Sequence, residues 1–320
     1  MKKIFIAGGA GFIGSNLTKY ILKHYKDAKV VIYDNFSSGK MKHFEKVLNK
    51  NVKIINGDIK NLKKLLKYTK GTDTIFHLAA NPDIAKAVEE PTIDFWEGTY
   101  LTNNILEAIR INKIKTLIYS SGSGVYGENK KINFNEDYGP CIPISTYGAS
   151  KLGCEAMIAS YSFMYNFKAI ILRFANVVGP FQTHGVGYDF LRKLKNNSKK
   201  IKVLGNGKQS KSYIHVEDII VAMFMVYKKI IKSNKNYDYY NIATGDYITV
   251  KEILEICLKL KNIKKNSIKI VYDRESRGWA GDVPIVRFNI KKIKKINWKP
   301  KYNSKQAIEN SLNAMIRNDS

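Results

Sequence analysis

The sequence contains few of the residues that characterise several large classes of protein. Its 320 residues include only 3 cysteines, which are widely spaced and form no C-x-x-C pair. This pattern argues against a disulfide framework or a zinc site and is typical of a reducing cytoplasm. Apolar stretches such as Ile219–Tyr227 are far shorter than the ~20 residues that cross a bilayer, and the chain opens into a strand-like segment without a signal peptide. We expect a cytoplasmic protein with no metal site and no membrane partner.

Acidic residues are also scarce. The chain has 27 Asp and Glu residues against 54 Lys and Arg, which gives a formal net charge of +27. Such an excess indicates either binding to a polyanion or a lysine-rich surface. The basic residues are spread over the whole length, without a helix-turn-helix, zinc-finger or aromatic RNA-binding signature, which favours the second interpretation. We expect no nucleic-acid partner, although a basic field would steer an anionic substrate towards its site.

Short apolar runs alternate with helix-length stretches through the first half of the chain. Strands separated by helices imply right-handed crossovers, so we expect an α/β protein with a Rossmann-type, doubly wound parallel sheet. The expected strands are Lys3–Gly8, Val30–Tyr33, Val52–Ile55, Thr74–Leu78, Thr116–Ser120 and Ala169–Arg173, and the expected helices are Ile13–Tyr25, Leu62–Lys70, Thr99–Ile111 and Tyr147–Tyr165.

After about residue 176 glycines, aromatics and polar loops interrupt this pattern. We expect residues 1–175 to form a nucleotide-binding domain, with returning segments near 215–243 that include a helix and a strand. Residues 176–320 are expected to form a smaller mixed α/β lobe, interleaved with the first domain, that binds the substrate. Within it, Val250–Leu260 and Gln306–Ile316 predict helices and Ile268–Tyr272 predicts a strand.

The first turn carries three glycines, Gly8, Gly11 and Gly14, between an expected strand and an expected helix. Glycine at such a turn lets the backbone approach a pyrophosphate, and the N–H groups at the start of the helix point at the negative charge. A glycine turn that serves packing alone is the alternative. The position between strand and helix favours a dinucleotide site, to which Phe12 and Ile13 would also belong.

Two acidic residues follow the next expected strands. Asp34 ends the second strand, where a carboxylate can accept hydrogen bonds from both adenosine ribose hydroxyls. Because it would also repel a 2′-phosphate, the sequence favours NAD over NADP. Asp58 and Ile59 follow the third strand, where an adenine could be held. A helix N-cap is the alternative role for Asp58.

Tyr147 and Lys151 are four residues apart at the start of a long expected helix. This spacing places both side chains on one helical face. A free tyrosine has a pKa of ~10, and lowering it by two units requires about 2.7 kcal/mol. An ammonium ~4 Å away offers roughly 4 kcal/mol at an effective dielectric constant of 20. Lys151 could therefore make Tyr147 a general base, although this spacing on its own is also that of a solvated surface pair.

The combination of motifs resembles the extended short-chain dehydrogenase/reductase family of nucleotide-sugar epimerases and dehydratases. Within this family, the motifs are most similar to those of 4-epimerases of the UDP-galactose type. The resemblance covers nearly the whole chain. Its motifs are Gly8–Gly14, Asp34-Asn35, Gly57-Asp58-Ile59, His77-Leu78-Ala79-Ala80, Ser120–Gly127, Tyr147 with Lys151, Leu172–Val177, Gly205–Gln209, His215–Asp218 and Tyr240–Ile242.

The resemblance implies roles for individual residues. Tyr147 would take the proton from the sugar C4 hydroxyl while hydride passes to the nicotinamide of NAD, and Lys151 would lower the pKa of Tyr147 and bind the nicotinamide ribose. The cofactor would be bound by Gly8, Gly11, Phe12, Ile13, Gly14, Asp34, Asn35, Asp58, Ile59, Leu78, Ala79, Ala80, Ser120, Tyr147, Lys151 and Phe174. The nucleoside-diphosphate sugar would be bound by Asn176, Gly185, Val186, Gln209, Lys211, Arg274 or Arg277, and Asp282.

One loop departs from the family pattern. Epimerases carry a Ser or Thr at the position of Gly122 that hydrogen-bonds the C4 oxygen. Ser121 and Ser123 flank this glycine, and Ser123 is the expected replacement. The 4,6-dehydratases carry an Asp-Glu pair where this chain has Ser123 and Gly124, so elimination of water would lack its acid and base.

We therefore expect an NAD-dependent nucleotide-sugar 4-epimerase that retains its cofactor. The main alternative is a C4 dehydrogenase that releases the 4-keto sugar, for instance from a GDP-heptose in the biosynthesis of a surface polysaccharide. A 4,6-dehydratase and a non-catalytic NAD sensor are less favoured. The family also implies a homodimer formed by helices near Phe95–Ile111 and Tyr147–Tyr165.

Overall fold

The computed structural model describes residues 1–44, 48–129, 133–196 and 199–319. The chain divides into two compact units, and it passes between them several times. The first consists of Met1–Val125, Thr146–Arg173 and Ile220–Tyr240, and the second of Tyr126–Ser145, Phe174–Ile219 and Asn241–Ser320. Residues 126–145, expected in the first domain, thus cluster with the second unit.

A seven-stranded sheet forms the centre of the first unit, with the strand order β11-β6-β5-β4-β1-β2-β3. Its pairs from β3 to β5 are parallel, and on β1 Ile4 lies opposite Val30 of β2 and Thr74 of β4. The order reverses between β1 and β4, the point at which doubly wound sheets bind ligands beside the carboxyl ends of their strands. The strands are β1 (Lys3–Ala7), β2 (Lys29–Asp34), β3 (Val52–Asn56), β4 (Thr74–His77), β5 (Thr116–Gly122), β6 (Lys168–Phe174) and β11 (Tyr237–Ile242).

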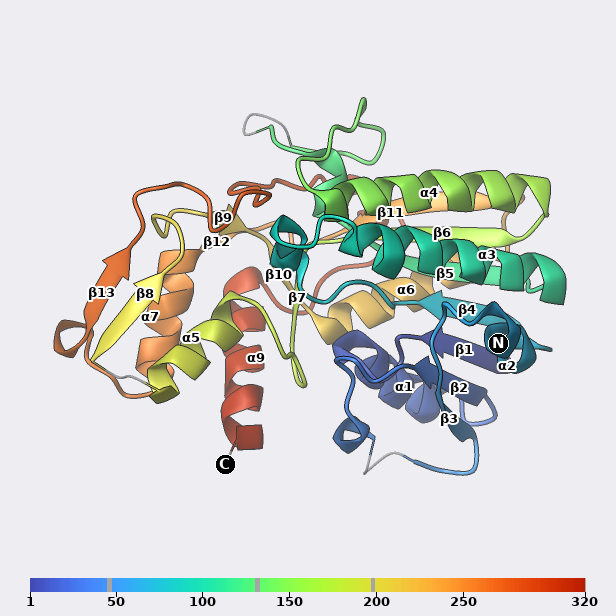
Figure 1. The fold of residues 1–320 in the computed structure, drawn as a ribbon, viewed down its shortest axis with the longest axis horizontal. Coiled ribbons are helices and arrows are strands. Elements are labelled where there is room, and N and C mark those ends of the chain that lie inside the picture. The colour runs from blue at the N-terminus through green and yellow to red at the C-terminus, as the bar shows by residue number, and fades with distance from the viewer. Residues whose placement is uncertain (45–47, 130–132, 197–198, 320) are drawn as a thin grey trace. The chain divides into compact units, whose positions relative to one another are not determined.

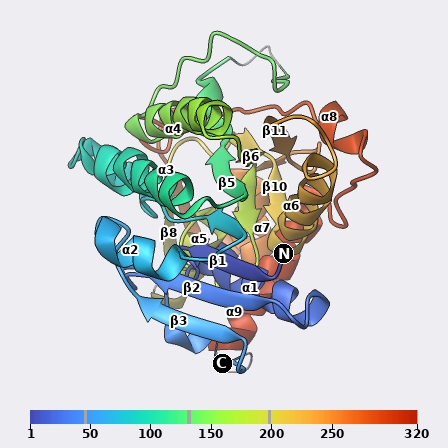
Figure 2. The ribbon, with the colours of Figure 1, turned by 90° about the vertical axis from the view of Figure 1, so that its right-hand side faces the viewer.

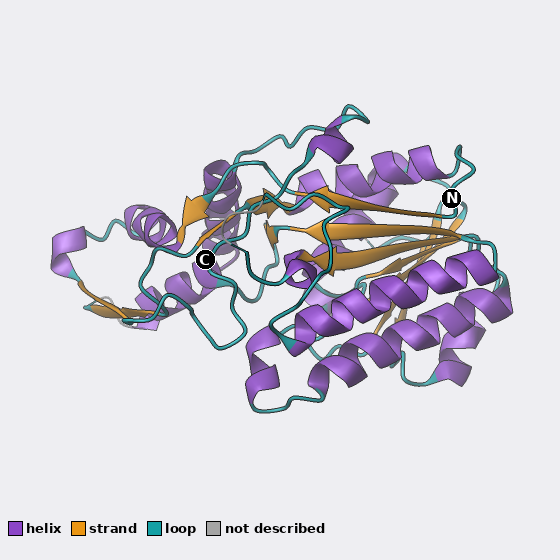
Figure 3. Ribbon diagram, turned by 90° about the horizontal axis from the view of Figure 1, so that it is seen from above, coloured by secondary structure: helices purple, strands orange, loops and turns teal. Residues whose placement is uncertain are grey.

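Helices cover both faces of this sheet (Figures 2 and 3). On one face α2, α3 and α4 bury a core that includes Leu65, Ile105 and Ile158. On the other face Phe224 of α6 packs against Tyr20 of α1, with ring centroids 5.0 Å apart. The helices are α1 (Phe12–His24), α2 (Leu62–Thr69), α3 (Tyr100–Asn112), α4 (Thr146–Met164) and α6 (Val216–Ile230). The predicted doubly wound α/β fold is confirmed.

The second unit has its own apolar core, to which Phe190, Leu254 and Leu312 from α5, α7 and α9 contribute (Figure 1). Its short strands pair as β10 with β7 and β13 with β8, both parallel, and β12 with β9, antiparallel. The helices are α5 (Val186–Asn196), α7 (Val250–Leu260), α8 (Lys291–Lys294) and α9 (Ser304–Asp319), and the strands are β7 (Asn176–Val178), β8 (Lys200–Val203), β9 (Ser210–Lys211), β10 (Tyr213–His215), β12 (Ile248–Thr249) and β13 (Lys269–Tyr272).

Most of the expected elements occur within one or two residues of their predicted bounds. A clear difference lies before α3, where Phe95–Thr99 forms a π-helical turn that continues directly into the helix. Such turns insert one residue into a helix and are frequent at functional sites. Among the described residues, no helix combines the length and hydropathy that a membrane crossing requires.

Candidate cofactor and catalytic site

The glycine turn after β1 leaves no room for side chains. Gly8 has φ +74°, and a Cβ built on it would lie 2.6 Å from the backbone nitrogen of Ala79 in the turn after β4. A Cβ on Gly14, in the first turn of α1, would lie 2.6 Å from the Cα of Gly9. The backbone at the start of α1 is therefore exposed to a ligand at the switch point of the sheet, which fits a pyrophosphate.

Asp34 connects the end of β2 to this turn. Its carboxylate accepts hydrogen bonds from the backbone N–H groups of Ala10 and Phe36, each at 2.8 Å. The side chain is buried, and burial raises the pKa of Asp34 while the two hydrogen bonds lower it. The neighbouring Asn35 is exposed, and its side chain accepts a hydrogen bond from the N–H of Ser37. The carboxylate therefore lies beside the glycine turn, at the position predicted to bind an adenosine ribose.

Replacing Asp34 with asparagine is expected to weaken NAD binding about tenfold or more, because a hydrogen bond to a charged group contributes about 1.5–3 kcal/mol. The variant should also discriminate less against NADP, since the charge that repels a 2′-phosphate is gone. Fluorescence titrations of the nucleotide-stripped protein with NADH and NADPH measure both effects. Asp27→Asn, at an exposed position, is the control for the change in net charge. An unchanged NADH affinity in Asp34→Asn would contradict the assignment.

The turns after β3 and β4 hold the remaining residues expected around the adenine. Asp58 is half-buried, and its carboxylate accepts a hydrogen bond from the N–H of Lys60 at 2.8 Å. The N-cap of α2 is Asn61, whose side chain accepts from the N–H of Lys64. The N-cap of α2 is therefore Asn61 and not Asp58, which was the alternative role predicted for Asp58. In the turn after β3, Ile59 is buried. In the turn after β4, Leu78, Ala79 and Ala80 are half-buried.

Lys151 attaches α4 to the carboxyl end of β5. It is 3% exposed, and its Nζ donates a hydrogen bond of 2.8 Å to the carbonyl of Ser120. The same Nζ lies 4.7 Å from the ring centroid of Tyr119 and 5.6 Å from that of Tyr147. The structure therefore brings together Tyr147, Lys151 and Ser120, as the sequence predicts.

The phenol and the ammonium have displaced pKa values. Burial and the nearby Asp94 carboxylate raise the pKa of Tyr147 to about 12. Burial lowers the pKa of Lys151 to about 8, although Cys154, Glu155 and Asp94 oppose this change. The lowering of the Tyr147 pKa that the sequence predicts is thus absent from the chain alone, because desolvation of the phenol dominates. At neutral pH the phenol is protonated and the amine is charged.

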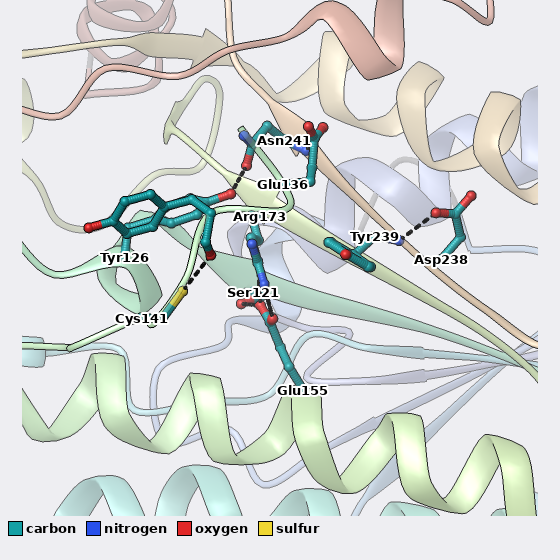
Figure 4. A network of polar contacts seen from close by, with 10 residues as sticks. Ser121, Tyr126, Glu136, Cys141, Glu155, Arg173, Asp238, Tyr239 and Asn241 are labelled. Atoms are coloured by element: carbon teal, nitrogen blue, oxygen red, sulfur yellow. Dashed lines mark hydrogen bonds and ion pairs between the residues drawn. The ribbon is translucent and has the colours of Figure 1, made fainter. Parts of the chain in front are cut away.

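The two flanking serines differ in their partners. Ser121 is buried, and its hydroxyl donates to the carboxylate of Glu155 at 2.5 Å (Figure 4). The guanidinium of Arg173 donates to both oxygens of the same carboxylate, at 2.7 Å in the shortest bond. The Ser121 hydroxyl is therefore part of a buried ionic network.

Ser123 is half-buried and begins a 3-10 turn that ends at Tyr126. Within the described part of the chain its hydroxyl makes no hydrogen bond. A Cβ on the next residue, Gly124, would lie 3.3 Å from the Cα of Gly148 and 4.0 Å from the Tyr147 ring. Ser123 thus lies on a turn that packs against the residue after Tyr147, which favours Ser123 over Ser121 as the partner of a substrate oxygen.

In the second unit, three of the predicted substrate residues are in direct contact. The Nζ of Lys211 lies 2.5 Å from Oδ1 of Asp282. Arg277 donates a 2.6 Å hydrogen bond to the carbonyl of Asp282 and forms an ion pair with Glu128. The N–H of Gly278 donates to the second carboxylate oxygen of Asp282 at 3.1 Å. Asp282 therefore holds two cationic side chains that could bind a diphosphate.

The other predicted substrate residues are more scattered. Exposed Arg274 lines, with Arg277 and Trp279, an open hollow of about 540 Å³. Gln209 is buried, its amide nitrogen donates to the carbonyl of Leu204, and its Oε1 has no hydrogen-bond partner among the described residues. The remaining substrate positions are Asn176, which begins β7, Gly185 with φ +100°, and Val186, which begins α5. Phe174, predicted to bind the cofactor, is buried at the end of β6.

Two buried carboxylates near Tyr147 and Lys151 were not predicted. Glu155 follows Lys151 by four residues, and this helical spacing could have identified it. Asp94 is 2% exposed and accepts hydrogen bonds from Asn81 and Thr146, which are 13 and 52 residues away in sequence. No local pattern marks such a residue.

Comparisons with known proteins agree with this geometry. The model of the NAD dependent epimerase/dehydratase family matches residues 4–243. A crystal structure of a UDP-galactose 4-epimerase is 31% identical, with 99% of both chains covered and a TM-score of 0.86. The UDP-N-acetylglucosamine 4-epimerase from Methanobrevibacter ruminantium, in complex with UDP-N-acetylmuramic acid, is 29% identical over 99% of both chains, also with a TM-score of 0.86. A human dTDP-D-glucose 4,6-dehydratase is 28% identical over 97% of this chain and 89% of its own.

These matches include enzymes with two different outcomes, epimerisation and dehydration, on one fold. The family model spans the glycine turn, Asp34, Tyr147 and Lys151, which the structure assembles in the first unit. The chain therefore belongs to the NAD-dependent epimerase/dehydratase family.

Proposed function

We propose that this protein is a nucleotide-sugar 4-epimerase that acts through a 4-keto intermediate and retains its NAD. The observation that carries the proposal is the Tyr147–Lys151 pair on α4, in which Lys151 donates to the carbonyl of Ser120. On the adjoining turn, the Ser123 hydroxyl makes no hydrogen bond to any residue that the structure describes. The epimerases among the relatives act on UDP-sugars, which supports a UDP-sugar as the first substrate to test.

In the proposed reaction, Tyr147 accepts the proton of the C4 hydroxyl and later returns it. Bound NAD supplies the hydride acceptor for C4 and the source of the returning hydride. Ser123 donates a hydrogen bond to the C4 oxygen, the role that Gly122 cannot perform. Lys151 remains an ammonium at neutral pH, where it stabilises the phenolate and can bind a ribose hydroxyl.

The pKa of Tyr147 sets a condition on this mechanism. At about 12 in the chain alone, it leaves very little phenolate at neutral pH. Lowering it by three units or more requires about 4 kcal/mol, as much as an ammonium ~4 Å away offers at an effective dielectric constant of 20. The Nζ of Lys151 lies 5.6 Å from the centroid of the Tyr147 ring, so the positive charge of bound oxidised cofactor would have to supply the remainder. The base is therefore expected to form only after NAD binds.

Two alternatives remain on the same fold. A C4 dehydrogenase, which releases the 4-keto sugar, is favoured by Gly122, because a weakly held C4 oxygen hinders return of the hydride. Its substrate could be a GDP-heptose for a surface polysaccharide. A 4,6-dehydratase is disfavoured because Ser123 and Gly124 provide no carboxyl group, and because a side chain at Gly124 would press on Gly148. A non-catalytic NAD sensor would not need Tyr147 and Lys151.

The decisive experiment incubates the purified protein with a panel of UDP- and GDP-sugars and follows product mass and NADH absorbance. An isomer of unchanged mass, without accumulated NADH, supports the epimerase. A product two mass units lighter, with NADH formed, replaces it with the dehydrogenase, and loss of water replaces it with the dehydratase. Absence of any product with every sugar would overturn the proposed function.

We further propose that the chain forms a homodimer through α3 and α4, which lie side by side (Figure 1). Large apolar side chains are exposed on and beside these helices, namely Phe95 at 50%, Trp96 at 47%, Ile111 at 45%, Phe163 at 82% and Met164 at 70%. Phe95 and Trp96 lie before the start of α3, and Ile111, Phe163 and Met164 lie at the carboxyl ends of α3 and α4, so apolar surface is exposed at both ends of this helix pair. Exposed apolar surface of this kind often marks an interface with another protein chain. In solution the protein, which we propose is cytoplasmic, would then present two sites per particle.

Light scattering at micromolar concentration is expected to give twice the monomer mass. Replacing Phe163 and Met164 with serine should produce monomers, because burial of these side chains drives the association. Ile231→Ser, at an apolar residue of similar type that is 44% exposed outside α3 and α4, is the control and should remain dimeric. A monomeric wild-type protein would refute the proposed dimer.

A further inference from the structure

Asp94 is a buried carboxylate in contact with the first residue of α4. It is 2% exposed and lies immediately before the π-helical turn Phe95–Thr99. One carboxylate oxygen accepts a 2.9 Å hydrogen bond from the amide of Asn81, in the loop after β4. The other accepts a 2.7 Å hydrogen bond from the hydroxyl of Thr146, the first residue of α4. One side chain therefore joins the loop after β4 to the helix that carries Tyr147.

The backbone around Asp94 makes a second connection to the same helix. The Ser150 hydroxyl donates to the carbonyl of Asp94 at 2.8 Å and lies 2.9 Å from the hydroxyl of Thr99. The π-helical turn approaches α4 so closely that a Cβ on Gly98 would lie 2.4 Å from the Ser150 oxygen. Thr146 and Ser150 are the immediate neighbours, in sequence, of Tyr147 and Lys151, so both bonds are formed next to the reacting pair.

We propose that Asp94 is a positioning residue of this site, whose buried carboxylate fixes the first turn of α4, and with it Tyr147 and Lys151, against the loop after β4. The proposal rests on the proposed function only in that the positioned pair carries out the chemistry. The contacts themselves are internal to the first unit and do not depend on the identity of the sugar.

The negative charge of Asp94 has a second consequence. Burial is the largest cause of the raised pKa of Tyr147, and the charge of Asp94 is the next. For Lys151, burial lowers the pKa, and the charge of Asp94 partly opposes this lowering. The other groups that face this pair are Cys154 and Glu155 on α4, Tyr119 on β5 and His77 on β4. Removing the charge at Asp94 while keeping its shape should therefore lower both pKa values, which moves both limbs of a pH–rate profile towards lower pH.

Asp94→Asn provides this change, because an asparagine can accept from Asn81 with its oxygen and donate to the Thr146 hydroxyl with its nitrogen. We expect both limbs of the kcat/KM profile to shift towards lower pH, because one negative charge beside the pair is lost while the shape of the side chain is kept. Glu97→Gln is the matched control on the same π-helical turn, since Glu97 pairs with Lys60 at the surface. It should leave both limbs in place.

A pair of variants at Thr146 tests positioning separately from charge. Thr146→Ser keeps the hydroxyl and should retain wild-type kcat, whereas Thr146→Val removes it and should lower kcat roughly tenfold at unchanged KM, the order expected for a lost hydrogen bond to a charged group. A similar kcat for valine and serine would overturn the positioning role. If Asp94→Asn lowers the maximum of kcat/KM but leaves the pH of both limbs unchanged, the electrostatic role of Asp94 would be overturned.

A readout without turnover separates this proposal from the proposed function. Tyrosines labelled with ¹³C at Cζ can be titrated by NMR, and the Tyr147 signal is assigned by its loss in Tyr147→Phe. In Asp94→Asn the Tyr147 signal should titrate at lower pH than in the wild-type protein, whether or not any sugar is converted. An unchanged titration in a protein that turns over a sugar would remove Asp94 from its role and leave the proposed function intact. If the Tyr147 signal titrates at lower pH in Asp94→Asn but the protein converts no sugar, the role of Asp94 is supported and the proposed function is overturned.

Discussion

Replacement of Tyr147 by phenylalanine is expected to lower kcat by about 10² to 10⁴, the range that a positioned general base contributes. The substitution removes one oxygen and keeps the ring, so the packing of the first turn of α4 should persist. The Lys151 ammonium should remain on the carbonyl of Ser120, since that 2.8 Å bond does not involve the phenol. The NAD content of the purified variant should therefore equal that of the wild-type protein. Steady-state kinetics and the absorbance of released nucleotide measure the two quantities.

A conservative variant elsewhere on the same helix provides the control for this experiment. Tyr161→Phe also removes one phenolic hydroxyl from α4, but that hydroxyl bonds Glu107 on the neighbouring helix. Its kcat should remain close to that of the wild-type protein. Turnover in Tyr147→Phe at the level of Tyr161→Phe would remove Tyr147 from the general-base role. Loss of NAD from Tyr147→Phe would instead assign it to cofactor binding.

Replacement of Glu155 by alanine is expected to lower the free energy of unfolding by about 3–5 kcal/mol, because it leaves a buried cation without its partner. The side chains of Arg173 and Glu155 are 7% and 4% exposed, and the guanidinium and carboxylate share several hydrogen bonds (Figure 4). The Ser121 hydroxyl would lose its acceptor in the same variant. Denaturant unfolding, followed by circular dichroism, measures the change in midpoint.

Two controls distinguish burial from charge in this experiment. Glu107→Ala breaks an ion pair with Arg110 at the surface, whose side chains are 24% and 40% exposed, and it should cost about 1 kcal/mol or less. Replacing both Glu155 and Arg173 with methionine removes the pair without leaving a lone charge, and it should recover much of the lost stability. Equal losses for Glu155→Ala and Glu107→Ala would contradict a dominant role for burial. A double variant as unstable as the single one would indicate that the ion pair itself stabilises the fold.

The prediction from sequence was most successful where a function depends on residues close together in the chain. The glycine turn needs only a strand, three glycines and a helix, and its geometry follows from the absence of Cβ atoms at Gly8 and Gly14. Tyr147 and Lys151 share a helical face because they are four residues apart. Asp34 follows from its position at the end of a strand beside that turn. Each of these inferences requires only local geometry.

The sequence alone therefore predicted the fold class, the glycine turn between strand and helix, and the placement of Tyr147 and Lys151 on one helical face. Only the tertiary structure showed that the Ser121 hydroxyl is bonded to Glu155, since this partner is 34 residues away on another element. It also decided the pKa of Tyr147, which depends on burial by the whole unit, and it identified Asp94, whose partners come from two distant segments. The physical reason is the same in each case: desolvation and long-range hydrogen bonds arise from packing between segments, and no local pattern of residues specifies them.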